Sequence, residues 1–161
     1  MEPESPKPAG PVAPPFGVYS SRTDDKGRLK LPVDFQEFLG SFEEKSVIAT
    51  TFDERIARLY PIPAWNETQK LLQEQGEDAQ AAEDLFFIAS RLGAKSGIDS
   101  QGRVLLPPEL RRNLNLENVP VYLEYFKSYV NVYNQEVYDA RTESARKDRE
   151  QKLALLKKKG L

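Results

Sequence analysis

Short runs of β-branched and aromatic residues alternate along the chain with turn residues and short amphipathic phrases. Four runs have the composition of β-strands, at 46–51, 56–60, 119–125 and 129–133. They form two pairs, and each pair follows a turn and a short helical phrase. The pattern therefore predicts a mixed α+β protein in which one succession of elements occurs twice.

The two halves repeat at an offset of 75 residues. The stretch 23–32, Thr-Asp-Asp-Lys-Gly-Arg-Leu-Lys-Leu-Pro, corresponds to 98–107, Ile-Asp-Ser-Gln-Gly-Arg-Val-Leu-Leu-Pro. Asp, Gly, Arg, Leu and Pro recur in register, and helical phrases at 33–39 and 108–114 follow the prolines. Each half is therefore predicted to contain a strand, a D-x-x-G-R turn, a strand, a short helix and two further strands.

A helical linker is expected between the halves. Pro63 can occupy the first turn of a helix at about 64–75, and Gly76 ends it. Asp78 can cap a second helix, for which Gly93 is the expected C-terminal stop. The sequence after the second half is again helical, and highly charged.

The prolines mark a leader before the first half. Six of the twelve prolines fall within the first fifteen residues, a composition typical of disordered chain. The predicted organisation is a disordered leader at 1–15, a first half at 16–62, a helical linker at 63–93, a second half at 94–138 and a charged C-terminal helix or tail at 139–161.

The 161 residues include no Cys and no His. Disulfides, thiolate or imidazole metal sites, Cys nucleophiles and His general bases are thereby excluded. An enzyme would have to use lysines or carboxylates such as Asp24 and Asp99, and turn formation already explains both aspartates. We therefore predict a protein that is not an enzyme, with no cofactor, no metal and no small-molecule substrate.

No apolar run is long enough to span a bilayer, and the acidic, proline-rich start lacks the basic and apolar regions of a signal peptide. We expect no membrane partner and a location in a reducing cytoplasm.

The net charge of −2 conceals segregated charge. Residues 16–32 and 95–112, which contain the repeated turns, each carry a net +2. Residues 66–84 hold six carboxylates against one lysine, and residues 141–161 hold eight cations against three carboxylates. Because neutralisation of phosphates dominates affinity for DNA, the turn regions are candidate DNA contacts despite the acidic total.

The repeated turn has a clear physical basis. An Asp at its start can accept hydrogen bonds from backbone N–H groups two residues on, and the Gly supplies a positive φ. Arg28 and Arg103 then begin the returning strands. Each guanidinium can be held by the turn aspartate in an ion pair, or can offer its free fork to a phosphate or a guanine edge.

Four features together resemble the MraZ family of bacterial transcriptional regulators, which consist of two SpoVT-AbrB-like domains. These features are Phe-Gly-Val-Tyr at 16–19, the two D-x-x-G-R-x-x-x-P motifs, Leu-Tyr-Pro-x-x-x-Trp at 59–65, and Ile-Asp-Ser-Gln-Gly-Arg-Val-Leu-Leu-Pro-Pro-Glu-Leu-Arg at 98–111. The resemblance covers about residues 16–134. It makes the halves at 16–62 and 94–138 the two domains, and implies a swapped-hairpin β-barrel with pseudo-twofold symmetry.

The same resemblance implies a ring-shaped homo-oligomer that binds double-stranded DNA at repeated promoter elements of a division and cell-wall gene cluster, in association with the nucleoid. Its expected DNA contact is Arg28. Lys26 matches the lysine of the family's K-G-R, and Arg103 is the partner of Arg28 in the second motif. Arg22 and Lys30 are added as candidates because of their charge beside the first motif.

Two functional readings remain. The first is a sequence-specific, repressor-like regulator that binds promoter repeats. The second is an oligomeric interaction module, antitoxin-like or a docking barrel, in which the acidic linker helices or the tail hold a protein partner. A preference for promoter DNA discriminates between them.

Overall fold

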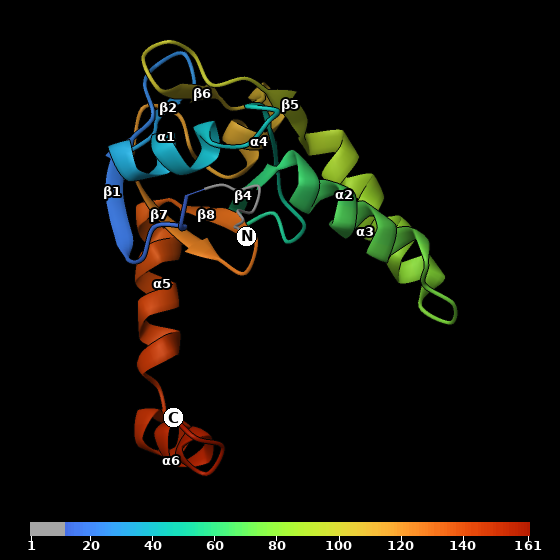
Figure 1. The fold of residues 1–161 in the computed structure, drawn as a ribbon, viewed down its shortest axis with the longest axis vertical. Coiled ribbons are helices and arrows are strands. Elements are labelled where there is room, and N and C mark those ends of the chain that lie inside the picture. The colour runs from blue at the N-terminus through green and yellow to red at the C-terminus, as the bar shows by residue number, and fades with distance from the viewer. Residues whose placement is uncertain (1–11) are drawn as a thin grey trace, which may run out of the picture.

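The computed structural model of the chain describes residues 12–161. Residues 1–11 of the leader predicted at 1–15 fall outside the described residues, and residues 12–15 form no helix or strand. The disorder of the leader stays a prediction. A body of strands and short helices carries two projections, one formed by α2 and α3 and the other by α5 and α6 (Figure 1). The coarse prediction of a mixed α+β protein is confirmed.

The bounds of the elements follow the predicted succession closely. The strands are β1 (Val18–Arg22), β2 (Arg28–Lys30), β3 (Val47–Thr50), β4 (Ala57–Pro61), β5 (Ala94–Ser96), β6 (Arg103–Leu105), β7 (Pro120–Phe126) and β8 (Tyr129–Tyr133). The helices are α1 (Val33–Gly40), α2 (Ile62–Gln73), α3 (Ala79–Leu92), α4 (Pro108–Asn113), α5 (Gln135–Arg146) and α6 (Arg149–Lys157).

Six strands form one antiparallel sheet, in the order β1-β7-β8-β4-β3-β5. The order does not follow the chain, because each half adds its first strand to the other half. β1 of the first half pairs with β7 of the second half, and β5 of the second half pairs with β3 of the first half. Among residues 12–161, the edge strands β1 and β5 are not paired with each other. Closure of the sheet into a barrel therefore stays a prediction.

The remaining two strands interlock the halves. β2 and β6 pair antiparallel as a separate two-stranded ribbon, with Leu29 opposite Val104. Beyond the ribbon, the Leu31 N–H donates to the Gly102 carbonyl at 2.9 Å, and the Leu106 N–H donates to the Gly27 carbonyl at 2.9 Å. Each half thus supplies backbone partners to the turn of the other half.

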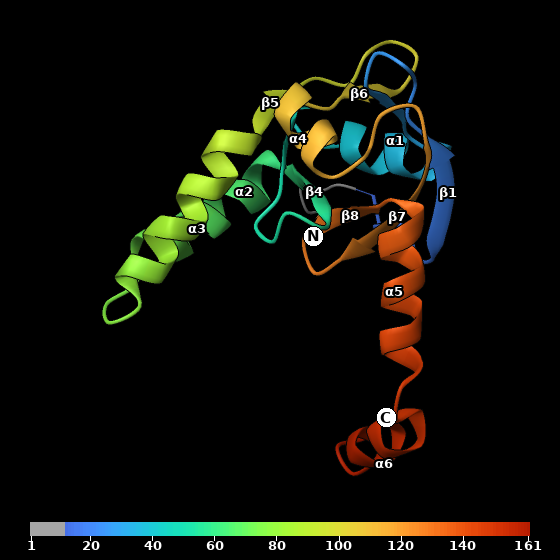
Figure 2. The ribbon, with the colours of Figure 1, turned by 180° about the vertical axis from the view of Figure 1, so that it is seen from behind.

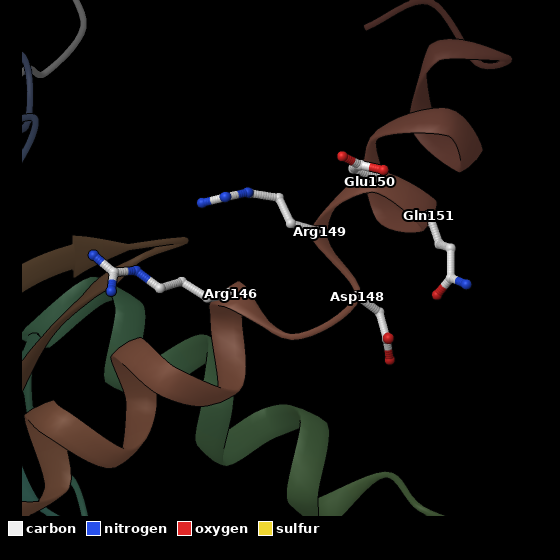
Figure 3. A pocket seen from close by; sticks show the side chains of 5 residues that line it. All are labelled: Arg146, Asp148, Arg149, Glu150 and Gln151. Atoms are coloured by element: carbon white, nitrogen blue, oxygen red, sulfur yellow. The ribbon is translucent and has the colours of Figure 1, made fainter.

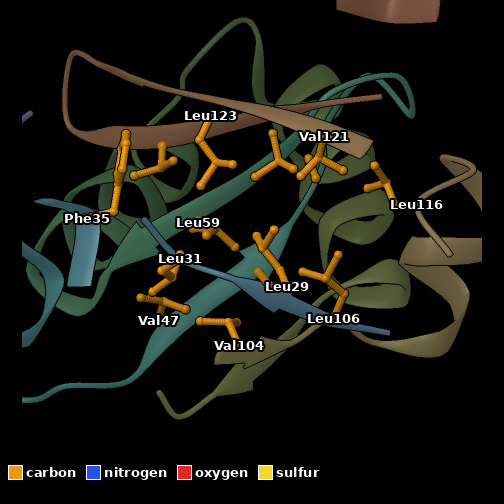
Figure 4. Packing of buried hydrophobic residues seen from close by; sticks show 14 of the residues in the cluster. Leu29, Leu31, Phe35, Val47, Leu59, Val104, Leu106, Leu116, Val121 and Leu123 are labelled. Carbon is orange, nitrogen blue, oxygen red and sulfur yellow. The ribbon is translucent and has the colours of Figure 1, made fainter. Parts of the chain in front are cut away.

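The core lies beneath this ribbon, between it and the large sheet (Figure 4). It contains pairs of side chains related by the 75-residue offset, all with no exposed surface: Leu29 and Val104, Leu31 and Leu106, Phe35 and Leu110. Full burial of a Leu or Phe side chain contributes about 1.5–3 kcal/mol. Residues 75 positions apart therefore occupy equivalent places in the core as well as in the turns.

Helices α2 and α3 form the projecting hairpin (Figure 1). The ring of Trp65 stacks against Phe52 of the body and Phe86 of α3, with ring centroids 6.2 and 6.4 Å apart. It also meets Tyr60 edge to face at 5.1 Å. One aromatic side chain thus fixes the base of the hairpin to the sheet.

Two local predictions need correction. Asp78 precedes α3 as predicted, but its side chain makes no capping hydrogen bond, since its backbone does not take the extended conformation in which a cap residue reaches back. The charged tail contains two helices and not one, because Asp148 takes a left-handed conformation with φ of 54°. None of the helices within residues 12–161 is long and apolar enough to cross a bilayer.

Candidate nucleic-acid interface

The first turn is built by the carboxylate of Asp24. Its Oδ1 accepts hydrogen bonds from the N–H groups of Lys26 at 3.0 Å and Arg28 at 2.8 Å. Its Oδ2 accepts from Nε of Arg28 at 2.6 Å. Gly27 supplies the positive φ, 81°, at which a side chain would be strained. The predicted role of Asp24 in forming the turn is therefore confirmed.

The second turn repeats these contacts bond for bond. Oδ1 of Asp99 accepts from the N–H groups of Gln101 and Arg103, both at 2.9 Å, and Oδ2 accepts from Nε of Arg103 at 2.9 Å. Gly102 has a φ of 75°. In both views the two turns lie side by side, at the end of the body opposite α5 and α6 (Figure 1, Figure 2).

The sequence left open whether the turn aspartates hold Arg28 and Arg103 in ion pairs. In the structure both arginines are held in this way. Each contact uses Nε alone. Within residues 12–161, the Arg28 side chain donates no other hydrogen bond, so its two terminal nitrogens are available to a ligand. The ion pair therefore orients the fork of Arg28 and leaves its outer edge free.

Four of the five candidate cations surround one shallow hollow. Its lining consists of Arg22, Thr23, Asp24, Arg28, Lys30, Arg103 and Asn118. Three of the cations come from the ribbon, because residues 28, 30 and 103 alternate with the buried Leu29 and Val104 and so share its outer face. Lys26, also predicted, does not line the hollow and lies exposed in the turn itself.

Lys30 and Arg103 are directly opposite each other in the ribbon. Like charges at such positions destabilise a strand pair. The Lys30 ammonium finds one partner in the Gln101 carbonyl, but that group carries no charge to neutralise it. The Arg103 guanidinium is already paired with Asp99 through Nε, so Lys30 is the less neutralised of the two cations.

Sequence reasoning missed two residues that support the turns. The Arg111 side chain lies over Gly27 and donates from Nη1 to the Leu106 carbonyl at 2.8 Å. The Gln36 side chain lies over Gly102 and donates to the Leu31 carbonyl at 2.7 Å. These two residues are 75 positions apart, so the repeat offset itself was the signal that could have found them.

The hydrogen bonds to Asp24 lower the pKa of its carboxyl to about 2, with the Arg28 N–H as the largest cause. The pKa of Asp99 is lowered in the same way by the Arg103 N–H. A carboxyl whose pKa is lower in the folded state stabilises the fold above its unfolded pKa, near 4. This stabilisation is lost as the pH falls toward 2.

Replacing Asp24 by Asn is therefore expected to lower the melting temperature at pH 7, and to lower it less as the pH falls from about 4 to 2. Thermal unfolding followed by circular dichroism, at one protein concentration, measures this difference. The exposed neighbour Asp25, replaced by Asn, is the control. A difference that stays constant down to pH 2 would contradict the role given to the charge.

A second surface hollow lies between α5 and α6, lined by Arg146, Asp148, Arg149, Glu150 and Gln151 (Figure 3). All five residues are exposed, and their side chains do not converge on a common point. It offers no set of groups arranged around a ligand. The hollow at the turns is the candidate site because it gathers four of the predicted cations.

No family model matches the chain. Among curated proteins it is similar to the transcriptional regulator MraZ of Thermomicrobium roseum, with 33% identity over 131 residues, which is 80% of this chain and 87% of that protein. The MraZ regulators of Koribacter versatilis and Acidobacterium capsulatum are 32% and 30% identical over 130 and 127 residues, which is 88% and 86% of their lengths. With identities at this level over most of both chains, the chain belongs to the MraZ family of transcriptional regulators.

Proposed function

We propose that this chain is a transcriptional regulator that binds double-stranded DNA with the outer face of the β2–β6 ribbon and the turn before it. One observation carries this proposal: Arg28, Lys30 and Arg103 share that face, and Arg22 joins them around the same hollow. The name shared by the relatives, transcriptional regulator, supports the same function.

The shape of the ribbon suits DNA. The major groove accepts a two-stranded β-ribbon, and known β-ribbon proteins read bases in this way. The free fork of Arg28 matches the two acceptors of a guanine edge. We assign phosphate contacts to Lys30, Arg103 and Arg22, which line the hollow, and to Lys26, which is exposed in the turn. In this arrangement Arg28 selects the sequence and the other cations fix the register.

The finer architecture is part of the proposal. The halves at 16–62 and 94–138 are two SpoVT-AbrB-like domains that complete a swapped-hairpin barrel, and several chains assemble into a ring. A single copy with about five cations would bind with a Kd of the order of 10⁻⁴–10⁻⁶ M at physiological salt. A ring that engages several promoter repeats at once would raise the avidity by about 10²–10⁴. Such binding would repress a division and cell-wall gene cluster.

Fluorescence anisotropy tests this function. The purified protein is titrated with a duplex from upstream of its own gene and with a shuffled duplex, at two salt concentrations. We expect binding to the native duplex to be at least ten times tighter and to weaken steeply with salt. Equal, weak binding to both duplexes would contradict the proposal and would favour the alternative, an oligomeric protein-interaction module.

Replacing Lys26 by Ala is expected to weaken binding to the native and the shuffled duplex about equally. A lysine on a phosphate carries no sequence information, and its loss lowers the slope of log K against log salt by about 1. The same titrations measure both effects. A loss of affinity for the native duplex alone would instead indicate that Lys26 contacts bases.

A further inference from the structure

The tail helix α6 buries nothing in the structure. Every residue from 143 to 161 is exposed, including Leu153 and Leu156, which lie three positions apart and so share one helix face. Lys152 and Lys157 flank that face. A helix of nine residues is too short to be stable in water without a packing partner. The Lys152 ammonium donates to the Ser144 and Ala145 carbonyls at the end of α5, but the leucines have no packing partner within residues 12–161. The tail thus presents a basic and apolar surface.

The α2–α3 hairpin offers a surface of opposite charge. A groove between its two helices is lined by Leu72, Gln73, Gln75, Ala79, Ala82, Glu83 and Phe86. Residues 66–84, which make up most of the hairpin, carry a net charge of −5, against +5 for residues 141–161. Leucine side chains can enter this largely apolar groove, in which Glu83 is the one charged lining residue, while lysines pair with Glu83 and with other carboxylates of the hairpin.

We propose that α6 of one chain docks in the α2–α3 groove of a second copy of this chain. Two observations favour a second copy over the same chain. α5 packs on β7 and β8 and holds α6 away from the hairpin, and α6 and the hairpin lie apart in both views (Figure 1, Figure 2). The only break in the tail is the short junction at Lys147 and Asp148.

A second copy also explains more than DNA or an anionic membrane would. DNA would neutralise the lysines and leave Leu153 and Leu156 in water. A membrane would bury the leucines but leave the groove of the acidic hairpin empty. Docking between copies covers the leucines of the tail and fills the groove of the hairpin, with one tail for each groove. The inference is independent of the proposed DNA binding.

The absence of cysteine makes a disulfide test direct. Chains with different tags, one carrying Glu83→Cys in the groove and the other Leu156→Cys on the tail, are co-expressed, purified and oxidised. The matched control pairs Leu156→Cys with Leu105→Cys, a position 51% exposed on the distant ribbon. We expect at least ten times more cross-linked heterodimer from the test pair. Equal yields from the two pairs would overturn the proposal.

Two further measurements exclude the other occupants. Adding Lys152→Glu and Lys157→Glu to the tail chain is expected to lower the cross-link yield at least fivefold at low salt. A chain carrying both cysteines that forms only an internal disulfide would show docking on its own hairpin and would overturn the proposal. The proposal would also be overturned if the tail bound added phosphatidylserine vesicles or a shuffled DNA duplex and the test cross-link was then lost.

Discussion

Replacing Leu29 by Ala is expected to destabilise both halves of the protein together, by about 2–5 kcal/mol. Leu29 has no exposed surface and pairs across the ribbon with Val104. Because β2 and β6 come from different halves, a cavity at this pair weakens one of the strand pairings that join the halves. Small domains are stable by only about 5–15 kcal/mol, so this single change removes a large share.

Chemical denaturation at a fixed protein concentration measures this loss. The control is Leu105→Ala, on the same ribbon but facing solvent, which is expected to change the free energy of unfolding by no more than about 0.5 kcal/mol. Two separate transitions in the Leu29→Ala variant, with one half unaffected, would contradict the interlocked core. Equal effects of the two substitutions would contradict it as well.

Replacing Arg28 by Ala is expected to remove most of the preference for the native duplex. A bidentate arginine–guanine contact contributes about 1–3 kcal/mol of discrimination, which corresponds to a loss of about 5- to 150-fold in native affinity. Binding to the shuffled duplex should weaken far less, because the remaining cations of the hollow still contact phosphates. Anisotropy titrations with both duplexes measure this ratio.

Arg28 also holds Asp24, so the variant needs a structural check. Arg28→Lys keeps a cation but cannot form the two parallel bonds to guanine, and it should lose the sequence preference while keeping the salt dependence. Arg55→Ala, an exposed arginine outside the hollow, is the matched control. If both Arg28 variants still bound the native duplex more tightly than the shuffled duplex, Arg28 would be ruled out as the residue that reads the sequence.

Local features of the fold could be predicted from the sequence. The 75-residue repeat identified both turns, and Asp24 and Asp99 form them through the same backbone bonds. The strands predicted at 46–51 and 129–133 differ from β3 and β8 by no more than one residue at each end. These features depend on neighbours within a few positions, where turn chemistry and side-chain periodicity decide the structure.

Pairings between distant residues could not be predicted in this way. Nothing near Lys30 in the sequence indicates that it faces Arg103, because strand register depends on the packing of both halves. Thr23 stands where the second half has Ile98, yet it is fully buried, since its hydroxyl bonds to the backbone of Val119, 96 residues away. The candidate cations were therefore found as separate residues, and only the structure places four of them around one hollow.

The central claim is that the turn and ribbon face lie against DNA, and affinity cleavage tests it most directly. An iron chelate attached to the single cysteine of Asp25→Cys, at the exposed first turn, should cut the native duplex at defined positions that recur with the promoter repeats. The same chelate on Ser144→Cys, on α5 at the opposite end, should produce no such pattern. Defined cuts from residue 144 and none from residue 25 would contradict the account.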